Sequence, residues 1–460
     1  MQDLTLSDSS RVAVMGGGPA GSLFSYFLMD MADRSGREIL VDIYEPRDFS
    51  RPAPSGCNMC GGILSESLVQ HLAMDGINLP TNLVQQGIDS YVLHMDVGRV
   101  RIRTPIDEKR IGAVYRGAGP GGSGDMNLIG FDGHLLSLAA QKGARVIRGR
   151  VDEVIWADGL PRVKIRNGTP QAYDLLAVTA GVNTRALELF KAASPGYRPP
   201  KTTGTAIREY FLGEKVIEKH LGSSMHVFLL DIPGLEFAAI IPKRDYVTMV
   251  LLGKEINQNL LKAFLNSREV KECMPPDWQW DQPVCRCSPL INVGGVVHPF
   301  QDRLLFLGDS GVTRLYKDGI GAAYRVAKIA SSTVMFEGLS EKNFRQHFLP
   351  VCRKINRDNF AGRGIFMVTR VIRKLRFARR AVLRMTMREQ RKTGNASRMS
   401  LVLWDMFTGS EPYKDIFLRT LHPFFFARLG LDLALSLLPL TAGRSFLTDT
   451  AEKSGIKDNE

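Results

Sequence analysis

The sequence predicts a mixed α/β (α+β) fold in three parts. The first observation is an N-terminal apolar strand that runs directly into a glycine-rich turn and a helix. The second is a group of strand-like segments in the middle of the 460-residue chain. The third is an arginine-rich, amphipathic C-terminal quarter. A hydrophobic content of 44% with a charged content of 23% excludes a disordered chain.

The first element is a strand–turn–helix–strand unit. Arg11–Met15 forms a β-branched strand that ends in the turn Gly16-Gly17-Gly18-Pro19-Ala20-Gly21. Ser22–Met31 follows with apolar residues at helical spacing, and Ile39–Tyr44 forms a second strand that ends at Glu45. This order is typical of a Rossmann-like dinucleotide-binding unit.

Each of three glycines in the turn has its own structural role. Gly16 permits the tight turn, Gly18 lets the backbone approach a pyrophosphate, and Gly21 allows close packing of helix on strand. The N-terminus of the helix offers free N–H groups to phosphate oxygens. Glu45 is placed to hold ribose hydroxyls. This unit alone leaves NAD and FAD open.

Two later segments favour FAD. Asp174–Gly181 is a buried strand that ends in small residues, and Arg303–Asp309 is a second one that ends in Gly308-Asp309. The Asp309 carboxylate is expected where a ribityl hydroxyl can bind. The glycine-rich helix start Gly319-Ile320-Gly321 can approach an isoalloxazine ring with its backbone.

Taken together, these motifs resemble the flavoprotein class that contains the geranylgeranyl reductases and the aromatic-ring hydroxylases. The similarity is greatest to the geranylgeranyl reductase-like group and spans residues 11 to about 330, including Cys60-Gly61-Gly62 and Phe131-Asp132. The resemblance implies a Rossmann-like FAD-binding domain with an inserted antiparallel-sheet substrate domain. The expected cofactor-binding residues are Gly16, Gly18, Pro19, Ala20, Gly21, Glu45, Gly181, Gly308, Asp309, Gly319, Ile320 and Gly321.

The chain departs from the family pattern at three places. The family usually has a glycine near Val312 and a proline near Tyr316, and this chain has neither. An arginine commonly precedes the Phe-Asp pair, whereas Ile129 and Gly130 stand there. Tyr316 and Lys317 therefore become candidate catalytic residues close to the flavin, with a merely solvated turn as the alternative.

Four of the six cysteines form two close pairs, Cys57/Cys60 and Cys285/Cys287. Cys60, then Cys57, are the first candidates for a catalytic role, because CxxC spacing favours a depressed thiol pKa and a redox-active pair. The alternatives are buried packing residues, or ligation of an iron–sulfur cluster or zinc by all four. No metal site is predicted, and the eight histidines are scattered without metal-binding spacing.

The motifs divide the chain into three regions. We expect a discontinuous FAD-binding domain (1–90, 126–185 and 295–345), a substrate or cap domain (91–125 and 186–294) and a helical C-terminal region (346–460). In the substrate domain, core packing is the expected role of four apolar residues, and lining a cavity is the alternative. These residues are Met225, Phe228, Phe237 and Met249.

The net charge of +13 is concentrated in the C-terminal region, where residues 345–398 hold 16 Lys/Arg and two acids. Ile365–Lys392 predicts one cationic amphipathic helix. Phe417–Leu440 is strongly apolar, but its charges suit an interfacial position better than a spanning one. We therefore expect residues 345–440 to bind an anionic membrane surface. The alternatives are a helix docked on its own domain and, with no supporting motif, nucleic acid.

The sequence thus predicts a membrane-peripheral, FAD-dependent oxidoreductase. The polar N-terminus and the cysteine usage indicate a cytoplasmic protein on the inner face of the cytoplasmic membrane. Family resemblance implies hydride transfer from reduced flavin to a double bond of a polyprenyl-type substrate. The electrons come from NAD(P)H or a reduced protein donor, because no second dinucleotide motif is present.

Three other functions stay open. One is a quinone-linked electron-transfer flavoprotein with a cysteine-ligated metal centre, for which an iron–sulfur cluster is possible but not favoured. Another is an FAD monooxygenase. The non-enzyme alternative is a flavin-binding redox sensor or scaffold at the membrane.

Overall fold

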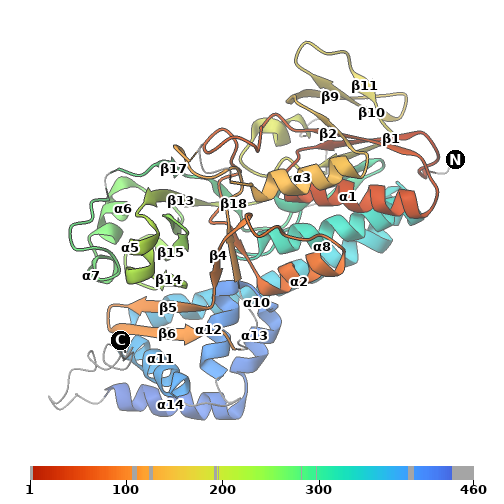
Figure 1. The fold of residues 1–460 in the computed structure, drawn as a ribbon. Coiled ribbons are helices and arrows are strands. Elements are labelled where there is room, and N and C mark those ends of the chain that lie inside the picture. Colours follow the sequence, from red (N-terminus) through yellow and green to blue (C-terminus); the bar gives the residue numbers. More distant parts are fainter. Residues whose placement is uncertain are drawn as a thin grey trace, which may run out of the picture.

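The computed structural model describes residues 4–105, 111–123, 128–190, 194, 196–280, 282–296, 298–391 and 398–437. Two large sheets form its centre, and helices cover them (Figure 1). The six-stranded sheet lies near the N-terminus, and the C-terminal helices lie at the opposite end of the molecule (Figure 1).

The six-stranded sheet has the order β19-β20-β12-β1-β2-β8, and only β19 pairs antiparallel. Its register aligns Met15 with Tyr44 and with Val178, and Val178 with Phe306. The carboxyl ends of four strands therefore meet at one edge, which is where open parallel sheets bind ligands. The strands are β1 (Ser10–Met15), β2 (Ile39–Tyr44), β8 (Arg145–Ile147), β12 (Leu175–Val178), β19 (Phe300–Gln301) and β20 (Leu304–Phe306).

Helix α1 (Pro19–Arg34) packs against α3 (Phe131–Gln141) and α8 (Gly319–Ser332) beside this sheet (Figure 1). Smaller elements complete the region. They are α2 (Glu66–Met74), the sheet β9 (Val151–Ala157), β10 (Leu160–Ile165) and β11 (Gln171–Ala172), and the helical turns η2 (Arg185–Leu189), η3 (Gly308–Ser310), η4 (Thr333–Glu337) and η5 (Phe344–Phe348).

The second large sheet joins segments that are far apart in the sequence. Its main path is β17-β13-β16-β15-β14-β5-β6, and all neighbours are antiparallel except β14 and β5. The strands are β5 (Ser90–Met95), β6 (Gly98–Arg103), β13 (Thr202–Phe211), β14 (Ser224–Phe228), β15 (Leu235–Lys243), β16 (Tyr246–Gly253), β17 (Cys285–Cys287) and β18 (Leu290–Asn292), the last paired with β13.

This sheet has a buried core on each face. One core contains Met225 and Val227 together with residues of the C-terminal helices, and the other contains Phe228 and Phe264. The second core is covered by α5 (Glu214–His220), α6 (Gln258–Leu265) and α7 (Arg268–Lys271). A small separate sheet has the order β3 (Ile63–Leu64), β7 (Ile111–Val114), β4 (Val84–Ile88).

The C-terminal region is a set of helices that pack on the second sheet or on one another. These are α10 (Leu349–Lys374), α11 (Arg376–Gln390), α12 (Arg398–Thr408), α13 (Tyr413–Thr420) and α14 (Pro423–Leu437). The short helix α9 (Glu341–Asn343) precedes them and contacts η5. The fully buried Trp404 of α12 stacks on Tyr91 of β5, with ring centroids 5.6 Å apart. The region is thus part of the folded body.

The prediction of one continuous helix over 365–392 is wrong. Leu375 adopts an extended conformation (φ −103°, ψ 108°) that ends α10 and begins α11. The break lets α11 pack against β6 and α14. Lys392 and residues 438–440 of the predicted apolar segment lie outside the described residues. Within the described chain, no helix has the length and hydropathy needed to cross a bilayer.

Candidate active site

A cavity of about 510 Å³ lies where the carboxyl edge of the six-stranded sheet faces the second sheet. Its volume falls in the range of roughly 300–1,000 Å³ that is typical of ligand sites. Most of the predicted site residues line it: Gly16, Gly18, Pro19, Ala20, Glu45, Cys60, Gly181, Gly308, Asp309, Tyr316, Lys317, Gly319 and Ile320. Gly21, Gly321, Cys57, Cys285 and Cys287 are not in the lining.

The glycine turn between β1 and α1 forms one wall of the cavity. Gly16 has a φ of +116°, which favours glycine. A Cβ at Gly21 would lie 1.9 Å from the Gly16 carbonyl oxygen, so the predicted close packing of helix on strand is confirmed. Helix α1 begins at Pro19 without a capping side chain on Gly18. Its positive end is therefore available to an anion in the cavity.

Glu45 follows β2 and lies beside this turn. Its carboxylate accepts hydrogen bonds from the backbone N–H groups of Gly17 and Arg47, both at 2.8 Å. Burial raises the pKa of the Glu45 carboxyl, and these two hydrogen bonds counteract part of that shift. The buried carboxylate is thus fixed in the cavity wall, where donors such as ribose hydroxyls can reach it.

The end of β20 brings Asp309 to the same cavity. Gly308 has a φ of +61°, and a Cβ there would lie 2.7 Å from the Ala20 Cβ. This close approach seats the Gly308-Asp309 turn on the first turn of α1. Asp309 is partly open to the cavity, and burial raises the pKa of its carboxyl. A hydroxyl donor in the cavity would stabilise the ionised form.

An arginine that sequence reasoning missed, Arg116, pairs with Asp132. Arg116, in the loop after β7, makes a bidentate pair with Asp132 (Nε–Oδ1 2.5 Å, Nη2–Oδ2 2.8 Å). Asn58 also donates to Asp132, and Arg47 donates to Asn58. Burial alone would lower the pKa of Arg116, but Asp132 outweighs it and the pKa is raised. Only the fold brings these residues together, because Arg116 and Asp132 share no sequence motif.

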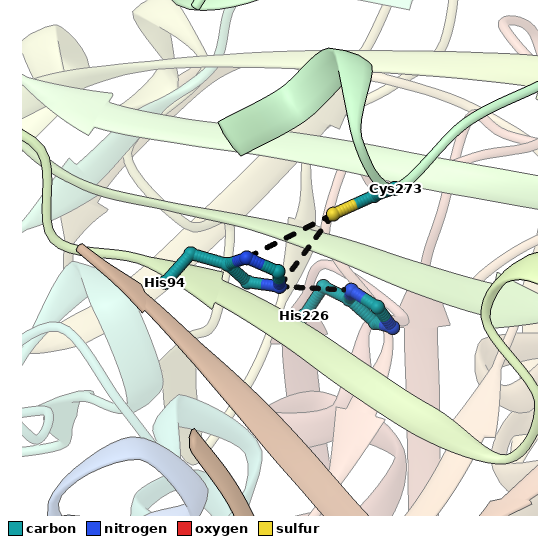
Figure 2. A group of neighbouring side chains, drawn as sticks. All are labelled: His94, His226 and Cys273. Carbon is teal, nitrogen blue, oxygen red and sulfur yellow. Dashed lines mark hydrogen bonds between the residues drawn. The ribbon is translucent and has the colours of Figure 1, made fainter. Parts of the chain in front are cut away.

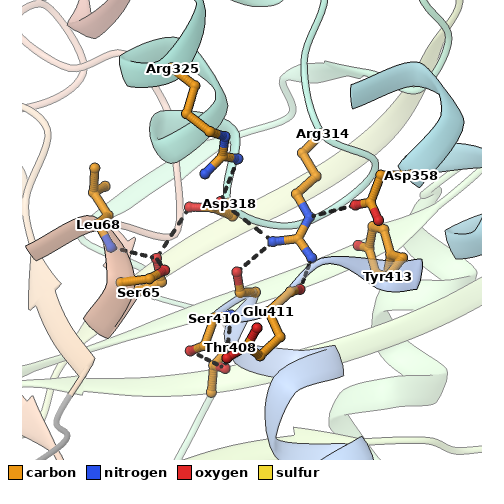
Figure 3. A network of polar contacts seen from close by, with 12 residues as sticks. Ser65, Leu68, Arg314, Asp318, Arg325, Asp358, Thr408, Ser410, Glu411 and Tyr413 are labelled. Atoms are coloured by element: carbon orange, nitrogen blue, oxygen red, sulfur yellow. Dashed lines mark hydrogen bonds and ion pairs between the residues drawn. The ribbon is translucent and has the colours of Figure 1, made fainter. Parts of the chain in front are cut away.

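The Tyr316-Lys317-Asp318 turn is held by the protein, which excludes a merely solvated turn. Tyr316 and Asp318 both adopt left-handed conformations, with φ of 60° and 55°. The Asp318 carboxylate accepts from Ser65 (3.2 Å) and Arg325 (2.9 Å) and lies 3.5 Å from Arg314 (Figure 3). A Cβ at Gly321 would lie 2.1 Å from Asp318 Oδ1, so this glycine makes room for the carboxylate.

Arg314 connects the same turn to the C-terminal helices (Figure 3). Its guanidinium donates to the carbonyls of Gly409 and Glu411 and lies 3.6 Å from the Asp358 carboxylate. The guanidinium also stacks over the Tyr413 ring at 4.5 Å. The loop before α8 and the α12–α13 connection are thereby fixed to one another.

Lys317 lies at an apolar end of the cavity. Its ammonium lies 4.4 Å from the Phe237 ring centre and 5.9 Å from that of Phe407. Burial lowers the pKa of Lys317 to about 8, although Cys60 acts in the opposite direction. The apolar wall here is formed by Ile207, Met225, Phe237, Ala239, Ile241, Val250, Leu252 and Phe407.

The four apolar residues predicted to pack in the core of the substrate domain lie on opposite faces of the second sheet. Met225 and Phe237 line the cavity. Phe228 and Met249 pack in the core on the opposite side of the sheet. The alternation of side chains along a strand is the cause of this separation.

The cysteines are all free thiols. Burial raises the pKa of Cys57, so the depressed thiol pKa expected from CxxC spacing is wrong for this residue. Burial likewise raises the pKa of Cys285 to about 11 and that of Cys287 to about 12. Cys60 lines the cavity, and its catalytic role stays a prediction. Among the described residues, a group of three or more ligand-type side chains close enough to share a metal ion occurs only at His94, His226 and Cys273, and the four cysteines considered as alternative ligands are not part of it.

Comparison with known proteins gives a likeness of fold. No family model matches the chain, and no curated protein matches it. A geranylgeranyl bacteriochlorophyll reductase-like protein from Thermoplasma acidophilum superposes with a TM-score of 0.63 at 15% identity, over 90% of this chain and 99% of that one. A flavoprotein/dehydrogenase from Cytophaga hutchinsonii gives 0.63 at 13% identity, over 93% and 99%.

Halogenase PltM, in a structure with phloroglucinol and FAD, superposes with a TM-score of 0.57 at 12% identity, over 94% of this chain and 97% of that one. The predicted fold class, a Rossmann-like domain with an inserted sheet, is therefore confirmed. The resemblance to geranylgeranyl reductase-like and related flavoproteins is confirmed at the level of the fold.

The buried Arg116–Asp132 pair yields a prediction for stability. In Arg116→Met, Asp132 loses its bidentate partner inside the protein, so the free energy of unfolding should fall by roughly 3–5 kcal/mol. The measurement is urea unfolding followed by circular dichroism. Arg150→Met is the matched control, because its pair with Asp152 is largely exposed and should cost at most about 1 kcal/mol. Equal losses in the two variants would contradict the prediction.

Proposed function

We propose that this protein is an FAD-dependent oxidoreductase that reduces a carbon–carbon double bond of a hydrophobic, polyprenyl-type substrate at a membrane surface. The observation that carries the proposal is that one cavity has two chemically different ends. One end is built from glycine turns and two buried or partly buried carboxylates, and the other is an apolar chamber that contains the Lys317 ammonium. A nucleotide cofactor suits the first end, and an apolar substrate suits the second.

The residues at the first end fit FAD. The uncapped start of α1 offers N–H groups to the pyrophosphate, and Gly18 keeps that approach open. Glu45 would hold the adenosine ribose, and Asp309 the ribityl chain. The start of α8, at Gly319, has no capping side chain either and would face the flavin ring.

At the second end, the protein would position the substrate, exclude water and supply a proton. Bound FAD supplies the hydride when reduced. Phe237 and Phe407 flank Lys317 and keep it in apolar surroundings. With a pKa of about 8, this ammonium can give up its proton near neutral pH, as a general acid must. Lys317 is therefore our candidate for the group that protonates the second carbon of the double bond.

Membrane association is supported by exposed apolar side chains of the C-terminal region. They lie on α13, at its C-cap and on α14, and comprise Phe417, Leu418, Leu421, Phe424, Phe426, Leu431 and Leu437. Helix α13 packs against α12, which carries Phe407. Several arginines of the basic segment are instead occupied within the protein, for example Arg379 with Asp96 and Arg388 with Asp432. In our proposal the apolar side chains provide most of the membrane affinity, and the remaining arginines add attraction to anionic lipid.

The function is tested first by the visible spectrum of the purified full chain and then by turnover. We expect flavin absorbance, which Asp309→Ala should weaken because a ribityl partner is lost. Chemically reduced protein should be reoxidised anaerobically by a geranylgeranyl substrate in detergent, with formation of the saturated product. A chain that cannot be loaded with FAD would refute the proposal. Oxygen-dependent oxidation of the substrate would establish the monooxygenase alternative instead.

The pKa of Lys317 yields a prediction for the pH profile. A general acid works in its protonated form, so the rate of substrate reduction should be constant below pH 8 and should fall about tenfold per pH unit above it. Lys317→Met should be slower by roughly 10²–10⁴-fold and should lack this limb. Lys317→Arg keeps the charge without an available proton and should stay slow. An unchanged alkaline limb in Lys317→Met would assign the pKa to another group.

The membrane proposal predicts that exposed rings on α14 carry affinity. Phe424 is 76% exposed and Phe426 is 54% exposed. Burying one such ring in lipid is worth roughly 1.5–3 kcal/mol, so Phe424→Ser with Phe426→Ser should weaken vesicle binding about a hundredfold or more. Co-sedimentation with phosphatidylglycerol vesicles measures this affinity. Phe336→Ser is the control, since this ring is 58% exposed but belongs to η4. Equal binding by both variants would refute the assignment of this surface.

A further inference from the structure

A second group of chemically reactive side chains lies on the far face of the second sheet from the cavity. His94 on β5 and His226 on β14 come from adjacent strands, and Cys273 follows α7 (Figure 2). All three side chains are buried, with exposures of 1%, 5% and 2%. The proposed oxidoreductase chemistry uses none of them.

The three ligand-type atoms converge on one point. His94 Nε2 lies 3.0 Å from His226 Nδ1 and 3.5 Å from Cys273 Sγ (Figure 2). One ligand atom from each residue lies within 4.8 Å of the other two. Zinc takes histidine nitrogen at about 2.0–2.1 Å and cysteine sulfur at about 2.3 Å in a tetrahedron, which sets ligand atoms about 3.3–3.8 Å apart. The observed spacing requires only small side-chain adjustments.

The surroundings fix both imidazole rings, and the ring of His94 faces that of His226 through Nε2 and Nδ1. The His226 ring also hydrogen-bonds the backbone of Leu221 at the end of α5, which leaves Nδ1 facing His94. The His94 ring is stacked on Phe228, with centroids 4.6 Å apart and planes at 16°. Ligand histidines commonly have their second ring nitrogen fixed in this way by a carbonyl.

A cation that binds at this group must displace the proton of the Cys273 thiol, so that the sulfur ligates it as a thiolate. Burial raises the pKa of Cys273 to about 12, and the thiol lies 3.0 Å from the Glu269 carbonyl oxygen. Arg99 is the nearby cation, and Glu269 and Glu272 are the nearby acids.

We propose that His94, His226 and Cys273 form a structural binding site for Zn²⁺. Binding would replace the Cys273 thiol proton, which is released to solvent, and would leave one position for water or a backbone carbonyl. The ion would link the segment after α7 to β5 and β14 through its ligands. Because the site lies behind the sheet, its role is in stability and not in substrate reduction.

The test uses the full chain without a histidine tag, stripped by chelator and titrated with Co²⁺ and Zn²⁺. We expect one equivalent of Co²⁺ to give tetrahedral d–d bands and a thiolate-to-cobalt charge-transfer band, both displaced by Zn²⁺. Added Zn²⁺ should raise the unfolding temperature. Cys273→Ser should lose the charge-transfer band. Loss of a residue that only orients a metal ligand weakens metal binding by roughly 10–100-fold, and loss of the ligand Cys273 itself should weaken it by more.

Cys352→Ser is the matched control, because Cys352 is another free, buried thiol that lies apart from this group. It should keep the band, the stoichiometry and the stabilisation by zinc. His226→Gln provides a second variant that retains Cys273 and should also bind weakly. Absence of the band in the unmodified chain, or its survival in Cys273→Ser, would overturn the proposal and leave a hydrogen-bonded group without metal.

Discussion

The geometry of the candidate site depends on the contacts of the buried Arg314 guanidinium. It lies between the Asp318 carboxylate, at the start of α8, and the carbonyls of Gly409 and Glu411, between α12 and α13. The Asp318 carboxylate packs closely against Gly321 and accepts a hydrogen bond from Arg325, so its position is fixed. Separating the two loops would leave this buried charge without its partners, which is costly, so the two loops are held in one relative position. The left-handed conformations of Tyr316 and Asp318 persist because their surroundings impose them.

This constraint makes the C-terminal helices part of the site. Once the α12–α13 connection is fixed to the turn before α8, Phe407 at the end of α12 lies beside Lys317 and closes the apolar end of the cavity. Trp404, one turn earlier, stacks on Tyr91 and joins the same helix to the second sheet. A region that the charge pattern presents as a membrane-binding extension therefore also forms part of the cavity wall.

The parts of the site that follow from sequence are those in which one short segment performs the whole task. The Gly16–Gly21 turn, Glu45 and Gly308-Asp309 each sit at the end of a strand, and parallel register brings strand ends together. Arg116 could not be predicted, since it meets Asp132 only through the packing of the loop after β7 on the start of α3. The break at Leu375 was missed for a related reason: both halves have helical periodicity, and tertiary packing of α11 on β6 decides where the chain turns.

The histidines show the same limit more sharply, because no spacing connects positions 94, 226 and 273. They are brought together by the parallel pairing of β14 with β5, in which Val227 is opposite Leu93 and Phe228 is opposite His94. In β14, Met225 and Val227 face the core with the C-terminal helices, and Met225 reaches the cavity, while His226 and Phe228 face α5–α7. A slip of one residue would exchange these two sets. The register of a single strand thus places an apolar residue in the cavity wall and a ligand-type residue behind it, so the proposed zinc site and the apolar end of the cavity depend on the same pairing.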